Sequence, residues 1–370
     1  MKLAWRELVR RPSRFAVAGA ILTLIAILLM FLGGLLDGLI ASSTGALRAQ
    51  RADLIVYSAT SKDSITRSRI DPEVRSEVEQ AVDGAEVGGL GSVQLGARLP
   101  DRGPRSLVPV VLFGYELAPT GIPGEPPADG EVYADSSLKS EGVREGTVLE
   151  LGPARSKVTV IGFTSDSQYS GQGTLWGTLD TWRTVVAANR PDAATGDGVV
   201  QALVVQADGD PAATARAIDQ ATDGATSTLT IDQAISALPG VEQQQATFNQ
   251  IIGVTVVIAI VVVALFFALL TVERTGLYGV LKAIGASSGS LFAGVLLQAV
   301  LVTLAAAALG AAAALALDAV IPPGSIPFVA LPGRLIASAA FLLLAAVIGC
   351  AFSLRRVLKV DPAAAIGGSM

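Results

Sequence analysis

Long uncharged apolar stretches alternate with one large polar block along this chain. Four stretches of at least 20 residues contain no Asp, Glu, Lys or Arg: 15–36, 251–272, 283–317 and 335–354. A helix of about 20 apolar residues is long enough to span the hydrocarbon core of a bilayer. We therefore predict four transmembrane helices in a 1+3 arrangement around a polar insert, with spans at 15–36, 251–272, 290–317 and 335–354 and the insert at 38–248.

The insert carries the patterns of a mixed α/β domain. Runs of β-branched and aromatic residues predict strands at 53–58, 107–115, 131–135, 147–151, 157–163 and 199–206, and helical spacing predicts helices at 71–82, 178–188 and 211–221. Asp71 followed by Pro72 is a typical helix start, because proline is tolerated at the first helical position. Pro109 has no N–H group to donate and therefore favours a sheet edge or a bulge. Residues 171–177 (GQGTLWG) are interpreted as a turn, because their spacing is wrong for a dinucleotide-binding loop.

Basic residues gather beside the spans, whereas the insert is acidic. The net charge is +4 for residues 1–14, +1 for the 273–290 connection and +2 for the 355–370 tail, while residues 38–248 carry 16 basic and 27 acidic side chains. Lys and Arg in short flanking segments mark the cytoplasmic side of a membrane. We therefore expect a bacterial inner-membrane protein with both termini and the 273–289 loop in the cytoplasm, the insert outside, and a short outer loop at 318–334.

Composition agrees with a polytopic α-helical membrane protein that carries a large extracytoplasmic mixed α/β domain between its first and second spans. Hydrophobic residues make up 51% of the chain and the mean hydropathy is +0.56, which is high for an ordinary soluble domain. The first segment is longer than the apolar region of a cleavable signal peptide, about 7–15 residues, so we expect a retained anchor. The pI near 5.0 reflects the acidic insert and gives no indication of nucleic-acid binding.

No group of residues predicts catalysis or metal binding. Residues 285–289 (GASSG) match the G-x-S-x-G pattern of serine hydrolases, but that motif needs a preceding strand and a histidine elsewhere. The chain contains no histidine. Its single cysteine, Cys350, falls in the last span and is interpreted as a small apolar side chain. We therefore expect no catalytic residue and no metal site.

Four motifs, spread over essentially the whole chain, are similar to segments of one family. The lead-in reads WRELVRR (5–11), the insert contains EVYAD (131–135), GVREGTVLEL (142–151) and KVTVIGF (157–163), the connection reads ERTGLYGVLKAIGA (273–286), and the tail contains RRVLKVDPAAAI (355–366). In this order, on the 1+3 topology, they resemble the FtsX/MacB family of ABC transporter permeases. The resemblance implies a permease that forms a homodimer in the lipid bilayer and is driven by a separate cytoplasmic ABC ATPase.

The chain fits a system in which the permease and the ATPase are separate subunits. No G-x-x-x-x-G-K-[ST] phosphate loop is present, so ATP and Mg²⁺ are expected on the partner and no cofactor is expected on this chain.

The 273–286 connection is the expected contact with the ATPase. Leu277, Val280, Leu281 and Ile284 form one apolar stripe along a short helix, which can press into a groove on a soluble partner. Gly285 suits the stop after that helix. The alternative is an interfacial helix that rests on lipid headgroups. The expected ATPase-coupling residues are Glu273, Arg274, Leu277, Tyr278, Leu281, Lys282, Ile284 and Gly285.

Few polar residues lie in or beside the spans. Gly34 and Gly38 can let another helix approach closely, and Asp37 between them is either an interfacial charge or part of a functional site. A substrate entrance between the first two spans would draw on Met30, Asp37, Glu242, Gln245 and Asn249. A central polar channel is not indicated. We therefore favour a device that transmits motion to the outer domain, or that extracts an amphiphile sideways, over a pore for hydrophilic solutes.

Three functions stay open from the sequence. The first is export or extraction of an amphiphile, coupled to ATP hydrolysis by the separate ATPase. The second is a signal transmitter that transports nothing and activates an outer cell-wall hydrolase. The third is haem export, because haem exporter permeases are similar in layout; in the absence of histidine, Met30, Tyr57 or Glu242 would have to bind the iron.

Overall fold

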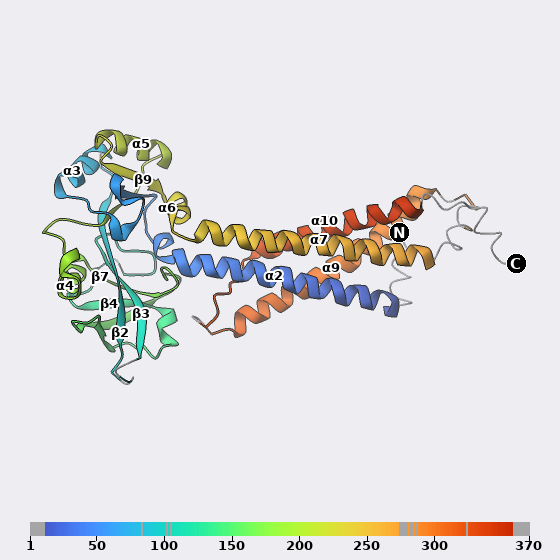
Figure 1. The fold of residues 1–370 in the computed structure, drawn as a ribbon, viewed down its shortest axis with the longest axis horizontal. Helices are drawn as coiled ribbons and strands as arrows, with labels where there is room; N and C mark the ends of the chain where they lie inside the picture. Colours follow the sequence, from blue (N-terminus) through green and yellow to red (C-terminus); the bar gives the residue numbers. More distant parts are fainter. Residues whose placement is uncertain are drawn as a thin grey trace. The chain divides into compact units, whose positions relative to one another are not determined.

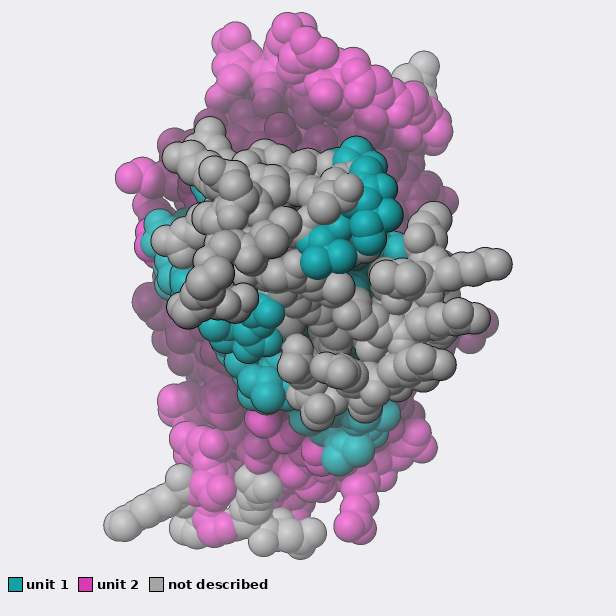
Figure 2. All heavy atoms as spheres, turned by 90° about the vertical axis from the view of Figure 1, so that its right-hand side faces the viewer, with its two compact units in different colours: residues 1–37, 245–321, 328–370 teal, residues 38–244, 322–327 magenta. Residues whose placement is uncertain are grey.

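The structure is a computed structural model in which two compact units can be described (Figures 1 and 2). The described residues are 12–82, 84–100, 103, 106–123, 125–273, 280, 284–285, 287–322 and 325–357. The helical unit comprises residues 1–37, 245–321 and 328–370, and the sheet domain comprises residues 38–244 and 322–327.

Four long helices confirm the predicted 1+3 arrangement: α2 (Pro12–Arg48), α7 (Val241–Glu273), α9 (Ser288–Val320) and α10 (Pro332–Val357). By length and composition, each contains a segment able to cross a membrane. All four helices run past the predicted span limits, because hydropathy marks the apolar part of a helix and not its ends. The α2 helix continues into the sheet domain as far as Arg48, and α7 already begins at Val241.

The helical unit has a common core to which all four helices contribute (Figure 1). Small residues let the helices approach closely. A Cβ atom added at Gly310 of α9 would lie 2.8 Å from the Cβ of Ala26 on α2, and one at Gly349 of α10 would lie 2.9 Å from the carbonyl oxygen of Ile260 on α7. The shared core consists of Leu22, Val263, Phe267, Ala299, Val302, Ala306, Ala346 and Cys350.

The described residues of the sheet domain form nine strands and four further α-helices. The helices are α3 (Pro72–Ala81), α4 (Leu179–Asn189), α5 (Pro211–Ala221) and α6 (Ile231–Ala237). The strands are β1 (Leu54–Ser58), β2 (Val87–Arg98), β3 (Leu107–Tyr115), β4 (Glu131–Asp135), β5 (Val148–Leu151), β6 (Ser156–Thr164), β7 (Gly173–Thr178), β8 (Ala202–Val205) and β9 (Thr226–Thr230). Short 3₁₀ turns cover Ala59–Ser61, Ile65–Arg67, Ser136–Lys139 and Pro191–Ala193.

The nine strands form one mixed sheet in the order β3-β7-β4-β6-β5-β2-β8-β1-β9. An additional antiparallel pairing between β2 and β3 closes the first six strands of this order into a ring. The strand β2 can close the ring because it is long enough to pair with three other strands. One edge pairs with β3, while the other edge pairs with β8 near Val87 and with β5 near Arg98. The strands β8, β1 and β9 continue the sheet outside the ring.

Tight packing of α4 on the ring explains two of its glycines. The indole of Trp182 on α4 is fully buried. A Cβ atom at Gly91 of β2 or at Gly114 of β3 would lie 2.6 Å from Trp182 atoms. Only glycine therefore leaves room for this side chain on the strands, and it joins a core that α3, α4 and α5 cover.

Most predicted elements of the insert are present, but four were missed and one interpretation was wrong. The strands β2, β7 and β9 and the helix α6 were not predicted. Residues 171–177 are not simply a turn, because Gly173–Thr178 forms β7 inside the ring. Asp71 does precede α3 with Pro72 in its first turn, although its side chain makes no capping hydrogen bond. Pro109 pairs with Gly96 of β2, while the β7 pairing starts only at Val110, so the missing N–H lies where β3 has one neighbour.

Candidate functional site

Two described apolar residues of the connection between α7 and α9, Val280 and Ile284, are exposed and joined by a backbone hydrogen bond. The N–H of Ile284 donates to the carbonyl of Val280 at 3.1 Å, which is the spacing of an α-helical turn. Gly285 follows with a φ of +102°, a conformation that favours glycine and stops the helix. The Val280 and Ile284 side chains are 52% and 78% exposed.

Only part of the predicted ATPase-coupling set can be placed. Glu273, at the end of α7, and Ile284 and Gly285 are described. The positions Arg274, Leu277, Tyr278, Leu281 and Lys282 lie outside the described residues, so the coupling role of this segment stays a prediction.

The G-x-S-x-G match has a structural explanation. Ser287 precedes α9, and its Oγ accepts a hydrogen bond from the N–H of Ser290 at 3.2 Å. This is a helix N-cap, in which the hydroxyl satisfies an otherwise unpaired amide of the first turn. The serine therefore sits at a helix start that follows a helical turn, and not in the strand-to-helix elbow that a serine hydrolase requires.

Two predicted entrance residues, Met30 and Asp37, contact the segment before α10 and the first turn of α10. Met30 is 1% exposed and packs in a cluster that includes Phe328 and Leu335. The Asp37 carboxylate accepts two hydrogen bonds from Arg334, at 2.9 Å from Nε to Oδ2 and at 2.5 Å from Nη2 to Oδ1. Its side chain is only 9% exposed. Asp37 is therefore a paired charge and not a solvated interfacial one. Met30 is buried within the helical unit.

The remaining entrance residues lie along α7. Glu242 and Asn249 are exposed and Gln245 is half-buried. Gln245 and Asn249 are four residues apart and so share one face of the helix. The predicted entrance thus divides into a closed part on α2, built around Met30 and Asp37, and an accessible polar part at the start of α7.

The residues around the Asp37–Arg334 pair form what we call the α2–α10 clamp: Gly33, Gly34, Asp37, Phe328 and Arg334. Of these, Phe328 and Arg334 were not predicted as site residues. A Cβ atom at Gly33 would lie 2.9 Å from the Arg334 side chain, and one at Gly34 would collide with the Phe328 ring. The N–H of Val329 donates to the carbonyl of Gly34 at 3.1 Å. The glycines therefore do permit a close approach, but to the segment before α10 and its first turn. One indication of this pair is visible in the sequence: an acidic residue, Asp37, directly follows the first predicted span, and a basic residue, Arg334, directly precedes the last.

Two of the residues considered for haem iron are enclosed in hydrophobic cores. Met30 belongs to the core of the helical unit and Tyr57 to a core of the sheet domain. Burial raises the pKa of Tyr57 far above its ordinary value, which disfavours the phenolate that would bind iron. Among the described residues, no group of three or more Cys, Asp or Glu side chains is placed to hold a metal ion.

Comparisons with known proteins point to one family. Residues 249–362, which include α9, α10 and most of α7, match the model of the FtsX-like permease C-terminal domain. The whole chain is 22% identical over 377 residues to a protein of Staphylococcus haemolyticus named as a hemin transport system permease, HrtB, with 100% of this chain and 99% of the relative covered. An ABC transporter permease of Mycobacterium tuberculosis is 39% identical over 116 residues, 30% of this chain and 31% of the relative.

A solved structure resembles the insert more weakly. The periplasmic region of MacB from Actinobacillus actinomycetemcomitans aligns with 50% of this chain and 90% of its own length, at 12% identity and a TM-score of 0.34. That score is too low to establish a common fold.

Proposed function

Because the chain belongs to the FtsX-like permeases of ABC transporters, we propose that it couples ATP hydrolysis by a separate ATPase to movement of its sheet domain. It is a multi-pass cell-membrane protein, and its family implies an ATPase partner. In the proposal two copies of the chain form the permease. Both termini and the 273–289 loop lie in the cytoplasm, the sheet domain lies outside, and the chain itself catalyses no reaction.

The observation that carries the proposal is the length of α7. Its 33 residues run without interruption from the sheet domain, to which Val241–Gln244 belong, to Glu273 beside the coupling segment. At 1.5 Å per residue the helix is about 50 Å long, whereas the hydrocarbon core of a bilayer is about 30 Å thick. A displacement at Glu273 therefore has a continuous helical path to the sheet domain.

The far end of α2 is also fixed to the sheet domain. Within that domain, the N–H of Ala46 donates to Gln168 at 2.9 Å, and the N–H groups of Ser170 and Gly171 donate to the carbonyls of Ser43 and Ser42, both at 3.0 Å. A Cβ atom at position 45 would lie 2.5 Å from the carbonyl oxygen of Asp166, so Gly45 permits this contact. The helix end is thus attached backbone to backbone, which suits a part that transmits force.

The chemistry of the spans favours an amphiphilic substrate. Apart from the Asp37–Arg334 pair, the polar side chains buried in the described spans are few and uncharged: Thr44, Thr255, Gln298, Thr303 and Ser338. A hydrated path for ions or sugars requires polar groups along its length. Extraction of a membrane-embedded molecule requires no such row of polar groups. Signal transmission to a cell-wall hydrolase requires none either.

The exposed turn at Val280 and Ile284 provides the test. Ile284→Asp places a carboxylate on a surface that is exposed in this chain, so the permease should fold and accumulate normally. If the ATPase covers that surface, the unpaired charge should weaken ATPase binding about a hundredfold or more. The matched control is Ser290→Asp, which adds the same charge in the first turn of α9, where an acidic residue is favourable. The measurement is recovery of the co-expressed ATPase with the solubilised permease.

The two substitutions separate coupling from an interfacial helix. Loss of the ATPase with Ile284→Asp, and its retention with Ser290→Asp, supports the proposal. Full retention of ATPase binding and hydrolysis by Ile284→Asp would place the turn on lipid headgroups and would contradict coupling at this site.

Haem export is the second candidate, favoured by the full-length similarity to proteins named for hemin transport. Met30 and Tyr57 are each enclosed in a hydrophobic core, so neither side chain is exposed to a ligand. Titration of the purified permease with hemin tests it. A Soret shift that disappears in Met30→Ala would favour haem over other amphiphiles, whereas an unchanged spectrum would argue against it.

A further inference from the structure

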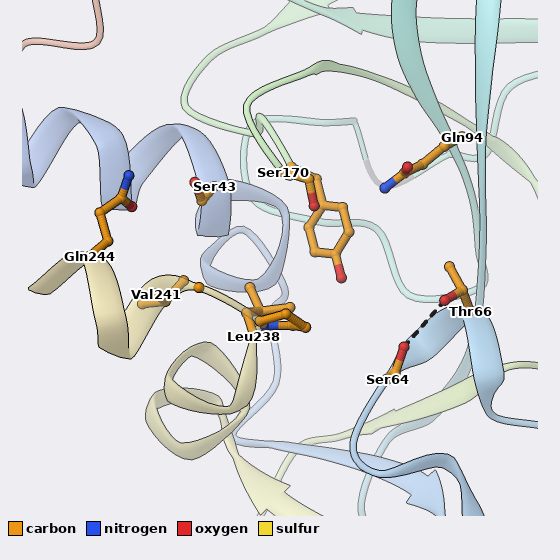
Figure 3. Close-up of a pocket in the computed structure, with 11 residues that line it drawn as sticks. Ser43, Ser64, Thr66, Gln94, Ser170, Leu238, Val241 and Gln244 are labelled. Carbon is orange, nitrogen blue, oxygen red and sulfur yellow. Dashed lines mark hydrogen bonds between the residues drawn. The ribbon is translucent and has the colours of Figure 1, made fainter.

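The sheet domain contains an open cleft of about 400 Å³ between the end of α2 and the start of α7 (Figure 3). None of its lining side chains is charged, although residues 38–248 carry 43 charged side chains in all. A charged ligand would find no counter-ion in this cleft. The lining residues are Ser43, Ser64, Thr66, Gln94, Tyr169, Ser170, Leu238, Pro239, Gly240, Val241 and Gln244.

Several polar groups in the cleft are free to bind a ligand. Ser43, Gln94 and Gln244 make no side-chain hydrogen bond within the described part of the chain, whereas the hydroxyl groups of Ser64 and Thr66 bond only to each other there, at 3.2 Å. Hydroxyl and amide groups both donate and accept hydrogen bonds. They therefore complement the hydroxyl groups of a neutral ligand better than a carboxylate, which only accepts, or an ammonium group, which only donates.

One wall of the cleft is aromatic and held in place. The Tyr169 ring meets Phe113 edge-on at 5.4 Å, and Phe113 stacks on Trp176 at 4.7 Å. Burial raises the pKa of Tyr169 to about 12, so its hydroxyl stays neutral. Leu238, Pro239 and Val241 add apolar surface. A flat aromatic ring beside hydroxyl and amide groups suits a sugar ring, which has apolar C–H faces and a polar rim.

The two sides of the cleft differ in how they are held. Ser43 and Ser170 are joined through the backbone, since the N–H of Ser170 donates to Ser43. The opposite side is the connection between α6 and α7, in which Gly240 has a φ of +87°. Figure 3 shows Gln244 and Val241 on α7 across from Gln94 and Thr66. A shift of the first turn of α7 relative to the end of α2 therefore changes the width of the cleft.

We propose that this cleft binds the neutral, hydroxyl-rich headgroup of a glycolipid and that displacement of α7 opens and closes it. The inference rests on the proposed function, in which α7 moves, and it names the chemical class of substrate. The start of α7 also carries the accessible polar residues Gln245 and Asn249, on the helix that continues into the second span.

Protection of a single cysteine tests the inference in the full-length permease. Thr66→Cys is introduced in a Cys350→Ala background, which removes the only native cysteine, and the protein is placed in phosphatidylcholine nanodiscs. An impermeant maleimide then labels the exposed position. We expect a neutral diglycosyl diacylglycerol to slow labelling severalfold and anionic phosphatidylglycerol to leave it unchanged. Ala213→Cys on α5, which is also exposed, is the matched control and should be labelled at one rate throughout.

Removal of the two glutamine side-chain amides in the cleft provides a second test of the inference. Gln94→Ala and Gln244→Ala break no hydrogen bond within the described residues, so the domain should fold unchanged. Each should weaken protection of Thr66→Cys about two- to tenfold, the effect of one lost ligand hydrogen bond. If maltose in solution slows labelling as much as the glycolipid does, the cleft binds sugar hydroxyl groups as proposed, and its ligand is a free sugar.

Three outcomes would overturn the inference: no protection by the glycolipid, equal protection by phosphatidylglycerol, or protection that survives both glutamine substitutions. ATPase recovery is measured in parallel on the same variants. Normal ATPase binding without glycolipid protection would reject the cleft alone, and would leave the proposed coupling intact.

Discussion

The two units of this protein use large apolar side chains in opposite ways. The sheet domain buries its largest ones completely, including Trp176, Trp182 and Phe113. The helical unit leaves residues such as Leu24, Leu265 and Ile336 about two-thirds exposed. In water, burial of such side chains is the main force that holds a domain together. In lipid there is no comparable force between helices, and close packing of small residues takes its place, as at Gly310 and Gly349.

The largest expected effect is therefore a cavity in the sheet domain. Trp182→Ala removes a fully buried indole that lies against Gly91 and Gly114, and should lower the free energy of unfolding of the domain by about 3–5 kcal/mol. Leu265→Ala, at a side chain that is 66% exposed, should change stability by less than about 0.5 kcal/mol. Limited proteolysis and thermal unfolding of both variants in one detergent measure the difference. Similar losses in both would mean that the exposed helix faces are covered by protein and not by lipid.

The next effect concerns the α2–α10 clamp. Arg334→Ala leaves the Asp37 carboxylate, which is 9% exposed, without the donor of its two hydrogen bonds. We expect a loss of about 2–3 kcal/mol in the stability of the helical unit. Arg334→Lys should recover part of that loss, because lysine keeps the charge but cannot form the two-pronged contact.

A double-mutant cycle isolates the pair. The combined Asp37→Asn and Arg334→Ala variant should be less destabilised than the sum of the single changes, because each single change leaves the other charge unpaired whereas the double variant leaves neither. Additive effects would show that the two side chains do not depend on each other.

A smaller effect is expected where α2 and α9 touch. Gly310→Ala adds a methyl group 2.8 Å from the Cβ of Ala26, which forces the helices apart and should cost about 1–2 kcal/mol. Gly294→Ala on the same helix meets nothing within 4 Å and should be neutral or slightly stabilising, because alanine is the better helix former. Thermal unfolding in detergent, followed by helical circular dichroism, distinguishes them. Equal behaviour of the two variants would show that small residues are not what brings these helices together.

The same contrast explains how much of the fold could be predicted. Four spans follow from uncharged length alone, so the helical unit was predicted with its number and order of helices. In the insert, the apolar run at 107–115 and the helical spacing at 211–221 gave the bounds of β3 and α5. The strands β2 and β7 were missed because their glycines break the apolar pattern. Those glycines leave room for side chains of other elements: Trp182 packs against Gly91 and Leu138 packs against Gly173.

The candidate sites show the same limit. The turn before Gly285 could be predicted, because a helix and its stop are local features. The pairing of Asp37 with Arg334 could not, since 297 residues separate them and only packing at Gly33 and Gly34 brings them together. The cleft beside Tyr169 draws on α2, the turn at Ser64, β2 and the start of α7. No local pattern in the sequence marks such a combination.

The smallest effect is electrostatic and belongs to the sheet domain. Glu116, just after β3, accepts hydrogen bonds from Arg75 at 3.1 Å and from the N–H of Gly89 at 2.6 Å. Burial by itself would raise the pKa of this carboxyl group, but the hydrogen bonds from Arg75 and Gly89 outweigh it and hold the pKa below the ordinary value of 4.5. The charged form is therefore favoured more in the folded domain than in the unfolded chain.

The sign of the pH dependence follows from that direction. Above the ordinary pKa of 4.5 the carboxylate is charged in both states, and its full contribution to stability is present. As the pH falls below 4.5, the unfolded chain takes up the proton first, and the contribution is lost as the folded group titrates. Because the side chain is 37% exposed, the gain should stay under about 1 kcal/mol. Glu116→Gln should therefore destabilise the sheet domain slightly at pH 7 and converge on the unsubstituted protein in acid. A difference that persists unchanged at low pH would mean that Glu116 acts through packing and not through its charge.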